Sequence, residues 1–371
     1  GATITFNQYQ SSVSIISGTG TTGYAIHQTQ RYHNYMPGKS HLILSSFVFG
    51  AANPNVTKRT GYFDSQSGVF VEQDATGNLN FVIRNYVNGS VSERRVPQSQ
   101  WNVDKCDGTG ASGFNIDVTK SQLAYFSFQW LGVGAVHCGF EYNGNFIIAH
   151  NFYNSNNLST VYFTYPNLPI RCEVSNSGAI STGNSMVQIC GTVISEGGYA
   201  DPGYDYSAMS GVITVGAGST APIIAIRSAS NFNGLPNRIA TRLTSTSVMS
   251  TATNIKYKVY RVPSNSYVVG GGWTSAGSNS GVEYNANPSS FTPGDLVLSG
   301  FSAAAIVGQG LGNVAPVSSA GGQDTAGASK KNFISTNYDC TDSSIYILAV
   351  ENMSAGSTTT VAASMNWREV Y

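Results

Sequence analysis

The stretch of sequence that decides the fold is residues 122–152, QLAYFSFQWLGVGAVHCGFEYNGNFIIAHNF. Phe126, Phe128 and Trp130 occupy alternate positions in it. Side chains of a β-strand point to its two faces in turn, so this spacing predicts a strand with one aromatic face. Residues 131–134 (LGVG) follow, and they favour a turn or a bulge because glycine tolerates positive φ.

Two further apolar runs, residues 135–142 and 145–152, are separated only by Asn143-Gly144. An Asn-Gly dipeptide between apolar runs is the strongest short-range signal of a hairpin with a two-residue type I′ turn. The sequence therefore predicts an antiparallel sheet in the first half of the chain, built around these three strands.

A two-residue turn also predicts the register of the hairpin. The expected pairs are Tyr142 with Asn145, Phe140 with Ile147, Cys138 with Ala149, and His137 with His150. In that register, one face carries the predicted core residues Val136, Cys138, Phe140, Ile147 and Ala149. The opposite face carries His137, Glu141, Ile148, His150 and Phe152.

Composition limits the classes of protein to consider. The chain has 371 residues, of which only 10% are charged, against about 25% in an average soluble domain. Its 19 basic and 19 acidic residues cancel, so neither nucleic acid nor an anionic membrane is expected as a partner. No apolar run reaches the roughly 18 residues that a membrane helix needs. The first ten residues lack the basic and apolar regions of a signal peptide, and none is expected.

Turn-rich segments divide the chain into four parts. Residues 1–40 hold short extended pieces between turns, which predicts an extended N-terminal arm. Residues 41–196 and 212–371 each contain several short apolar runs and each predicts an antiparallel β-sandwich of jelly-roll or lectin-like type. Residues 197–211, GGYADPGYDYSAMSG, predict the linker. No segment has helical periodicity with caps, so the predicted class is all-β, with two tandem sandwiches.

The cysteines indicate a reducing compartment. There are five of them, an odd number, and they are widely spaced without a CxxC motif. Cys138 and Cys190 lie in apolar strand runs, where thiols behave as small hydrophobic groups. We therefore expect five free thiols: Cys106, Cys138, Cys172, Cys190 and Cys340.

Two histidines of the hairpin are the candidate metal ligands. In the predicted register, His137 and His150 form a non-hydrogen-bonded pair with Cα atoms roughly 4.5 Å apart. Two imidazoles so placed could bind a transition metal, with Glu141 as a distant third ligand. The alternative is a stacked histidine pair on a half-buried surface, which the lack of a second pair of ligands nearby favours.

Glu72 and Asp74 are the candidate carboxylates of a glycosidase. Some glycosidases place two acids on one face of a strand, at alternate positions. The next position of the pattern is Thr76 rather than a third acid, so we expect solvated charges at a strand end.

Three other motifs predict structure rather than chemistry. Asp104, Asp107 and Asp117 surround a glycine-rich loop without the spacing of a calcium loop, and turn formation accounts for them better. Residues 308–312 (GQGLG) lack the spacing and context of a dinucleotide loop. Trp273, after three glycines, could stack on a sugar ring or belong to a core. We predict no catalytic residue and no cofactor.

Residues 58–196 resemble a family of virion structural proteins from marine tailed phages and large double-stranded DNA viruses of algae and protists. The resemblance rests on a set of motifs, and a weaker likeness continues to residues 366–369. The motifs are residues 59–64 (RTGYFD), 68–74 (GVFVEQD), 101–105 (WNVDK), 107–110 (DGTG), 129–134 (QWLGVG), 161–162 and 166–171 (VY and PNLPIR), and 192–198 (TVISEGG).

This resemblance implies a non-enzymatic virion component at the capsid surface, a vertex or a fibre, assembled in the host cytoplasm. Its expected partners are other virion proteins and copies of itself, with a trimer slightly preferred. A surface with few charges does little to repel its own copies. The alternatives are a carbohydrate- or receptor-binding adhesin module of a viral tail or fibre, which would bind host surface glycans, and, less favoured, a β-sandwich glycosidase.

Overall fold

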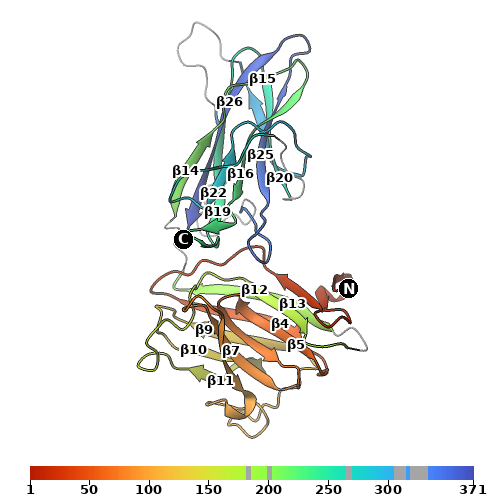
Figure 1. Ribbon diagram of the computed structural model, residues 1–371, viewed down its shortest axis with the longest axis vertical. Helices are drawn as coiled ribbons and strands as arrows, with labels where there is room; N and C mark the ends of the chain where they lie inside the picture. Colours follow the sequence, from red (N-terminus) through yellow and green to blue (C-terminus); the bar gives the residue numbers. More distant parts are fainter. Residues whose placement is uncertain (181–184, 199–202, 264–269, 305–314, 318–332) are drawn as a thin grey trace. The chain divides into compact units, whose positions relative to one another are not determined.

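The computed structural model describes residues 1–180, 185–198, 203–263, 270–304, 315–317 and 333–371. Within them the chain consists of β-strands and loops, with two three-residue 3-10 turns, Gln8–Gln10 and Gln98–Gln100. The chain divides into two compact units, Gly1–Ala200 and Asp201–Tyr371 (Figure 1). Each unit contains two large antiparallel sheets, which confirms the all-β prediction of tandem sandwiches. No helix in the described ranges is long and apolar enough to cross a bilayer.

The first sheet of unit 1 has seven antiparallel strands in the order β1-β2-β13-β4-β9-β10-β11. The last strand in sequence, β13, lies between β2 and β4, so the sheet joins both ends of the unit. The strands are β1 Thr3–Asn7, β2 Ser12–Ile16, β4 Ser40–Val48, β9 Gln122–Phe128, β10 Val136–Tyr142, β11 Asn145–Phe152 and β13 Ser185–Glu196.

The second sheet of unit 1 has six strands in the order β3-β12-β5-β6-β7-β8. Strands β5 to β8 follow one another along the chain as a meander, and β12 adds to its first strand. The strands are β3 Tyr24–Gln28, β5 Val56–Phe63, β6 Gly68–Gln73, β7 Leu79–Asn85, β8 Ser92–Pro97 and β12 Ile170–Asn176.

The core of unit 1 lies between the two sheets, where alternate side chains of the facing strands meet. Phe81 of β7 contacts Phe126 of β9 edge to face, with ring centroids 6.1 Å apart, and Phe140 of β10 at 5.6 Å. Trp101, in the loop after β8, packs on Phe81 at 4.6 Å. All four rings are buried, and because aromatic rings bury large apolar areas, these contacts hold one sheet against the other.

The predicted hairpin is present as β10 and β11, joined by Asn143-Gly144. Asn143 has a φ of 51° and Gly144 a φ of 79°, and a type I′ turn requires both to be positive. Tyr142 pairs with Asn145 as predicted. The two-residue turn therefore sets the register at this end of the hairpin.

The predicted register is wrong beyond Gly139, because β11 contains a bulge. Gly139 pairs with Ile148, but the preceding residue, Cys138, pairs with His150. Ala149 is therefore an extra residue on β11 and does not pair with Cys138. From this point on, the side chains of β11 lie on the face opposite to the predicted one.

A distant loop accounts for the bulge. The carbonyl oxygen of Ala149 accepts hydrogen bonds from the N–H groups of Val103 and Asp104, both at 3.1 Å. Because Ala149 is the extra residue, its carbonyl group points toward the loop and can accept both hydrogen bonds. As a result Phe152, predicted on the outer face, is buried in the core.

Residues 1–40 differ from the predicted extended arm, because they supply three strands to the sandwich. β1 and β2 form a hairpin whose second strand pairs with β13, and β3 pairs with β12. These partner strands come from the far end of the unit, so their pairing leaves no local signal in the sequence.

Unit 2 combines a five-stranded sheet, ordered β14-β26-β19-β24 with β15 beside β26, and a six-stranded sheet, ordered β21-β22-β16-β25-β20-β23. The strands of the first are β14 Tyr204–Met209, β15 Ile213–Val215, β19 Ala240–Ser250, β24 Ala315–Val317 and β26 Thr359–Val370. Those of the second are β16 Thr220–Ser228, β20 Ile255–Val262, β21 Thr274–Ser275, β22 Val282–Asn285, β23 Asp295–Ser302 and β25 Ile345–Asn352. A small ribbon joins β17 Asn231–Phe232 to β18 Leu235–Pro236.

The predicted linker, residues 197–211, contains strand β14. β14 pairs with β26, and Tyr206 stacks on the buried Trp367 with ring centroids 6.4 Å apart. The alternation of Tyr204, Tyr206 and Ala208 is the sequence signal of this strand, and the glycines and proline that precede it hide that signal.

All five cysteines are free thiols. Cys106, Cys138, Cys172 and Cys340 are buried, whereas Cys190, predicted inside an apolar strand, is exposed. The register of β13 shifts beside Cys190, and this bulge turns its side chain away from the core.

The hairpin predicts an order of stability effects for unit 1. Phe140→Ala should lower the free energy of unfolding by roughly 3–5 kcal/mol, because it leaves a cavity in the aromatic core. Gly144→Val should cost less, roughly 1–2 kcal/mol, from the left-handed conformation of a residue with a Cβ. Urea denaturation of both variants measures the order, and a larger effect of Gly144→Val would contradict this account of the core.

Candidate functional site

The structure separates the two candidate metal ligands. Because of the bulge, His137 pairs with Asn151, and its Nδ1 lies 2.6 Å from the Asn151 Oδ1. His150 is buried on the other face, where its Nδ1 accepts a hydrogen bond from the Asn102 N–H at 3.3 Å. The predicted pair of facing imidazoles is therefore wrong. In the described part of the chain, no three His, Cys, Asp or Glu side chains gather as a metal site would require.

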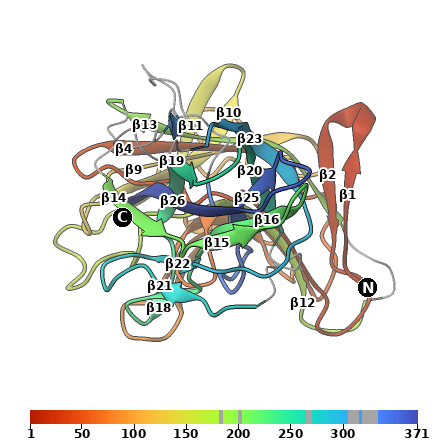
Figure 2. The ribbon, with the colours of Figure 1, turned by 90° about the horizontal axis from the view of Figure 1, so that it is seen from above.

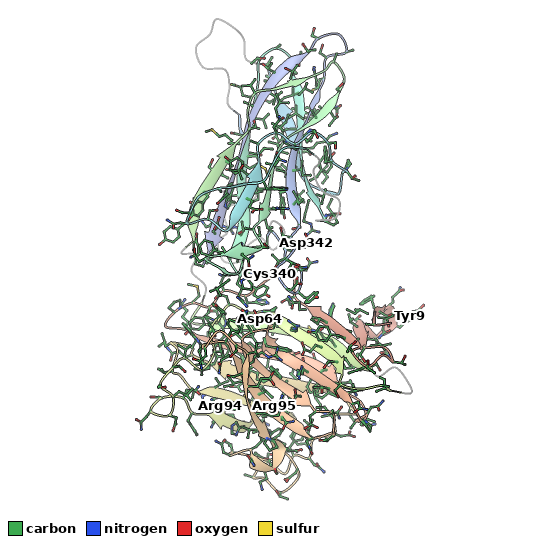
Figure 3. The ribbon with its side chains drawn as sticks, viewed as in Figure 1. Tyr9, Asp64, Arg94, Arg95, Cys340 and Asp342 are labelled. Carbon is green, nitrogen blue, oxygen red and sulfur yellow. The ribbon has the colours of Figure 1, made fainter. Side chains whose placement is uncertain are left out.

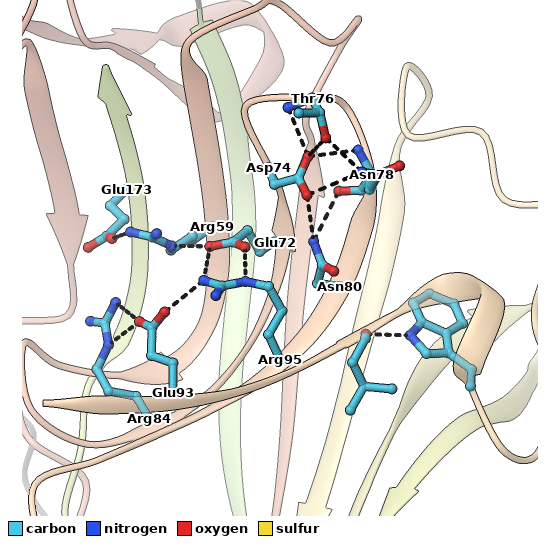
Figure 4. A network of polar contacts seen from close by, with 12 residues as sticks. Arg59, Glu72, Asp74, Thr76, Asn78, Asn80, Arg84, Glu93, Arg95 and Glu173 are labelled. Carbon is cyan, nitrogen blue, oxygen red and sulfur yellow. Dashed lines mark hydrogen bonds and ion pairs between the residues drawn. The ribbon is translucent and has the colours of Figure 1, made fainter. Parts of the chain in front are cut away.

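Glu72 and Asp74 do not form a carboxylate pair either. Asp74 lies beyond the end of β6, where its Oδ1 accepts N–H hydrogen bonds from Thr76 and Asn78, both at 2.9 Å (Figure 4). It therefore stabilises the turn between β6 and β7. Glu72 is buried on the outer face of the six-stranded sheet and belongs to a larger network of charges.

This network, which we call the ion-pair lattice, is a row of alternating arginine and glutamate side chains across the outer face of β12, β5, β6, β7 and β8 (Figure 4). Each glutamate lies between two arginines, which satisfies its buried oxygens. The successive pairs are Arg171–Glu173 at 3.1 Å, Glu173–Arg59 at 2.5 Å, Arg59–Glu72 at 2.6 Å, Glu72–Arg95 at 2.7 Å, Arg95–Glu93 at 2.7 Å and Glu93–Arg84 at 2.8 Å.

Aromatic rings form the floor of the ion-pair lattice. The guanidinium of Arg84 lies 5.4 Å from the ring centroid of Phe63 and 5.0 Å from that of Phe70. Arg59 lies 5.6 Å from the Phe70 centroid, and Arg171 lies 5.5 Å from that of Phe63. Planar guanidinium groups suit such stacking, so Arg59, Arg84 and Arg171 are each held by a carboxylate beside them and a ring beneath them.

Two glutamates of the lattice, Glu173 and Glu93, are held in the charged form. Burial alone would raise the pKa of Glu173, but Arg171 and Arg59 bring it below its ordinary value. For Glu93, Arg84 and the neighbouring arginines likewise outweigh burial and lower the pKa. A general acid of a glycosidase needs a raised pKa instead, so these carboxylates suit structure rather than proton transfer.

The three aspartates near the glycine-rich loop each accept hydrogen bonds from backbone N–H groups of nearby residues. Asp104 accepts N–H hydrogen bonds from Cys106 at 2.8 Å and Ser112 at 2.9 Å. Asp107 and Asp117 each accept a hydrogen bond from the N–H two residues later. Their oxygens are thus directed at backbone donors, as the prediction of turn formation requires.

Trp273 of unit 2 is covered on one face by an arginine. The guanidinium of Arg227 lies 4.2 Å from the ring centroid of Trp273, over its face, and the rest of Trp273 packs beside a small core cluster. A sugar ring therefore cannot stack on that face. Residues 308–312 lie outside the described residues.

The largest feature that sequence reasoning missed is the outer face of the seven-stranded sheet. Strands β13, β4, β9 and β11 present apolar side chains there, so that Leu44 lies beside Tyr125 and Leu42 beside Ile194, while β10 contributes Gly139 between β9 and β11. We call this the apolar face; its members are Leu42, Leu44, Leu123, Tyr125, Phe146, Ile148 and Ile194. In these five strands, Glu141 and Glu196 are the charged residues on that side.

A glycine brings two aromatic rings of the apolar face together. Tyr125 of β9 lies opposite Gly139 of β10. Since Gly139 has no side chain, the Tyr125 ring extends over it and reaches Phe146 of β11, with ring centroids 4.8 Å apart. Phe146 is 48% exposed. The spacing of Leu123 with Tyr125 could have revealed this second apolar face, because it alternates with the core positions.

Comparisons with known proteins find distant likenesses of fold. No family model and no curated protein matches the chain. A glycoside hydrolase family 16 endo-glucanase from Bacteroides ovatus is similar over 52% of this chain and 85% of its own, with a TM-score of 0.33 and 10% identity. A legume lectin-like domain from Entamoeba histolytica is similar over 53% and 88%, with a TM-score of 0.31 and 9% identity. Likenesses at this level assign neither a family nor an activity.

Two histidines of unit 1 have a lowered pKa, and one of them lies on the core side of the seven-stranded sheet. His41 of β4 is buried, with its ring 5.2 Å from that of Tyr35 and 5.9 Å from that of Phe128. Burial lowers the pKa of His41 to about 4. Burial, with smaller effects of Arg31 and His41, lowers the pKa of His33 to about 3. Both imidazoles are therefore neutral at neutral pH.

We expect the ion-pair lattice to be sensitive to loss of one carboxylate. Glu72→Gln should lower the free energy of unfolding by roughly 3–5 kcal/mol, because it leaves two arginines without their shared buried partner. Glu351→Gln is the matched control, since Glu351 bridges Lys256 at 2.7 Å and Lys258 at 2.9 Å near the surface. That change should cost less than about 1 kcal/mol. Calorimetry measures both, and equal losses would contradict the structural role of the lattice.

The buried histidines predict a loss of stability in mild acid. The unfolded chain binds a proton at His41 below its ordinary pKa of 6.5, while the folded chain does so only near 4. Stability is therefore present above pH 6.5 and falls as the pH decreases, by roughly 2 kcal/mol for this residue between pH 7 and 5. In the His41→Phe variant, this part of the loss of stability between pH 7 and pH 5 should disappear. Urea denaturation at the two pH values measures the free energy of unfolding. An unchanged pH dependence in His41→Phe would contradict this prediction.

Proposed function

We propose that the chain is a non-enzymatic structural component of a virion, at the capsid surface, a vertex or a fibre, that assembles with copies of itself and with other virion proteins. The resemblance of residues 58–196 to virion structural proteins supports this proposal. The residues that carry the resemblance hold the fold together. Arg59 and Glu72 belong to the ion-pair lattice, Trp101 packs in the core, and Asp64 accepts N–H hydrogen bonds from the turn before β6.

The apolar face is the observation that carries the proposal. Large exposed apolar patches on soluble proteins mark surfaces that bind other proteins. The apolar face extends over several strands. Phe146 and Ile194 are respectively 48% and 44% exposed on it. Glu141 lies opposite Phe146, but the row of Leu44, Tyr125 and Ile148 across the face carries no charge. Such a surface fits an uncharged protein partner, as expected for a chain whose charges are few and cancel.

The state of the carboxylates supports a role without catalysis. Hydrolysis of a glycosidic bond requires one carboxyl group that gives up a proton and another that attacks or activates water. The glutamates of the lattice are bracketed by arginines, and Asp74 is engaged by turn N–H groups. These acids have no geometry for that reaction.

A carbohydrate- or receptor-binding adhesin is the second candidate, and the Tyr125–Phe146 pair favours it. Two aromatic rings on an open sheet face offer the apolar platform on which a sugar ring stacks. In this case the ligand would be a host surface glycan and the pair would form the binding site.

The two candidates predict different results for the apolar face. Leu44→Glu combined with Phe146→Glu should prevent incorporation of the chain into particles, because two added charges on the face oppose its burial. Leu158→Glu, at an exposed apolar residue of a loop outside this face, is the control and should be incorporated normally. Electron microscopy with labelled antibody and mass spectrometry of purified particles measure incorporation. Absence of the unmodified chain from particles would refute the proposal.

A glycan array tests the adhesin. The unmodified chain should bind no glycan if it is a scaffold. Glycan binding that Phe146→Ala abolishes, with thermal stability unchanged, would instead establish the second candidate and place its site at the aromatic pair.

A further inference from the structure

The β1–β2 hairpin forms one border of the seven-stranded sheet, and β1 is the outermost strand (Figure 2). In the described residues no strand pairs with its outer edge. Side chains from Thr3 to Phe6 are all exposed, with Phe6 at 65%. Tyr9, at the turn, is fully exposed and extends away from the sheet (Figure 3). This border therefore presents unpaired backbone N–H and C=O groups and apolar side chains together.

Two other borders of unit 1, at β11 and at β8, are protected. The edge of β11 is covered by a loop, since Val103 and Asp104 donate N–H hydrogen bonds to the Ala149 carbonyl, and the Asn151 N–H donates to the Asn102 side chain at 2.8 Å. The edge strand β8 carries charges and a proline in its sequence SERRVP. Covering loops, charges and proline are the usual means of preventing unwanted strand pairing.

β1 has none of these protections. The first 30 residues contain no Asp, Glu, Lys or Arg, and β1 itself reads TITFN without proline. An open, uncharged and partly apolar edge is the structure on which another strand adds. The absence of charge also excludes a partner recognised by salt bridges, and favours one with the same uncharged composition.

We infer that β1 binds β1 of a second copy of the chain, antiparallel, about a two-fold axis through Thr5. This alignment places Ile4 opposite Phe6 of the second copy, and Phe6 opposite its Ile4. Thr5 faces Thr5 at the axis, where two hydroxyl groups can form a hydrogen bond. An aromatic residue opposite a β-branched residue is a favourable cross-strand pair, and so is Thr opposite Thr. The strand is therefore complementary to an antiparallel copy of itself.

The result is one continuous sheet that runs through both copies. A pair of five-residue strands buries much less area than a standard protein interface of roughly 1,600 Å². We therefore expect a weak dimer in solution, which many copies held close together in a particle would strengthen. The inference rests on the proposed function in that it names the contact by which copies assemble.

Two charge variants at the same positions test the pairing. Ile4→Lys with Phe6→Lys places like charges opposite each other and should raise the dissociation constant by roughly tenfold or more. Ile4→Lys with Phe6→Glu places each lysine opposite a glutamate of the second copy and should retain the dimer. Both side chains are exposed within one chain, so neither variant disturbs the fold. Tyr9→Lys, outside the paired strand, is the control for added charge.

Sedimentation equilibrium up to about 0.5 mM, a range suited to a small interface, measures the dissociation constants. The inference is supported if the unmodified chain, Tyr9→Lys and the Lys/Glu variant dimerise and the Lys/Lys variant does not. A monomer or a trimer for the unmodified chain, or equal behaviour of the two double variants, would overturn it. Absence of a dimerising chain from particles would refute the proposed function alone, and a monomeric chain present in particles would refute this inference alone.

Discussion

Unit 1 depends on the contact of aromatic rings between its two sheets. Phe81 of one sheet meets Phe126 and Phe140 of the other, and Trp101 covers them from the side. Because strand side chains alternate, this packing leaves each sheet with an outer face that must be stabilised in another way. The two sheets solve this differently, and their solutions determine what each face can do.

The six-stranded sheet covers its outer face with its own charges. Alternating arginines and glutamates cross its strands above Phe63 and Phe70, and every glutamate lies between two arginines. The charged groups of such a surface already have partners within it, so few of them are available to a ligand. The seven-stranded sheet instead leaves leucine, isoleucine and aromatic side chains half-exposed. Of the two outer faces of unit 1, this second one leaves apolar surface that a partner could bury. The proposed function is therefore assigned to it.

The sequence predicts features of this fold that are local. Asn143-Gly144 predicts the hairpin and its register near the turn, because the turn alone determines them. It does not predict the bulge at Ala149, since that bulge depends on hydrogen bonds from the loop at Val103 and Asp104. The pairing of β2 with β13 and the lattice around Glu72 were missed for the same reason. Each joins residues whose proximity follows from the complete sheet order rather than from any spacing in the sequence.

The bulge in β13 has a practical consequence. It exposes Cys190, whereas the other four thiols are buried. Burial raises the pKa of Cys106 and of Cys172 to about 12, and that of Cys138 well above its ordinary value, so these groups hardly form the reactive thiolate. Cys190 is therefore the one accessible thiol of the protein, and it lies beside the apolar face. A maleimide dye or spin label attached there, without any mutation, would report directly on whether that face becomes covered during assembly.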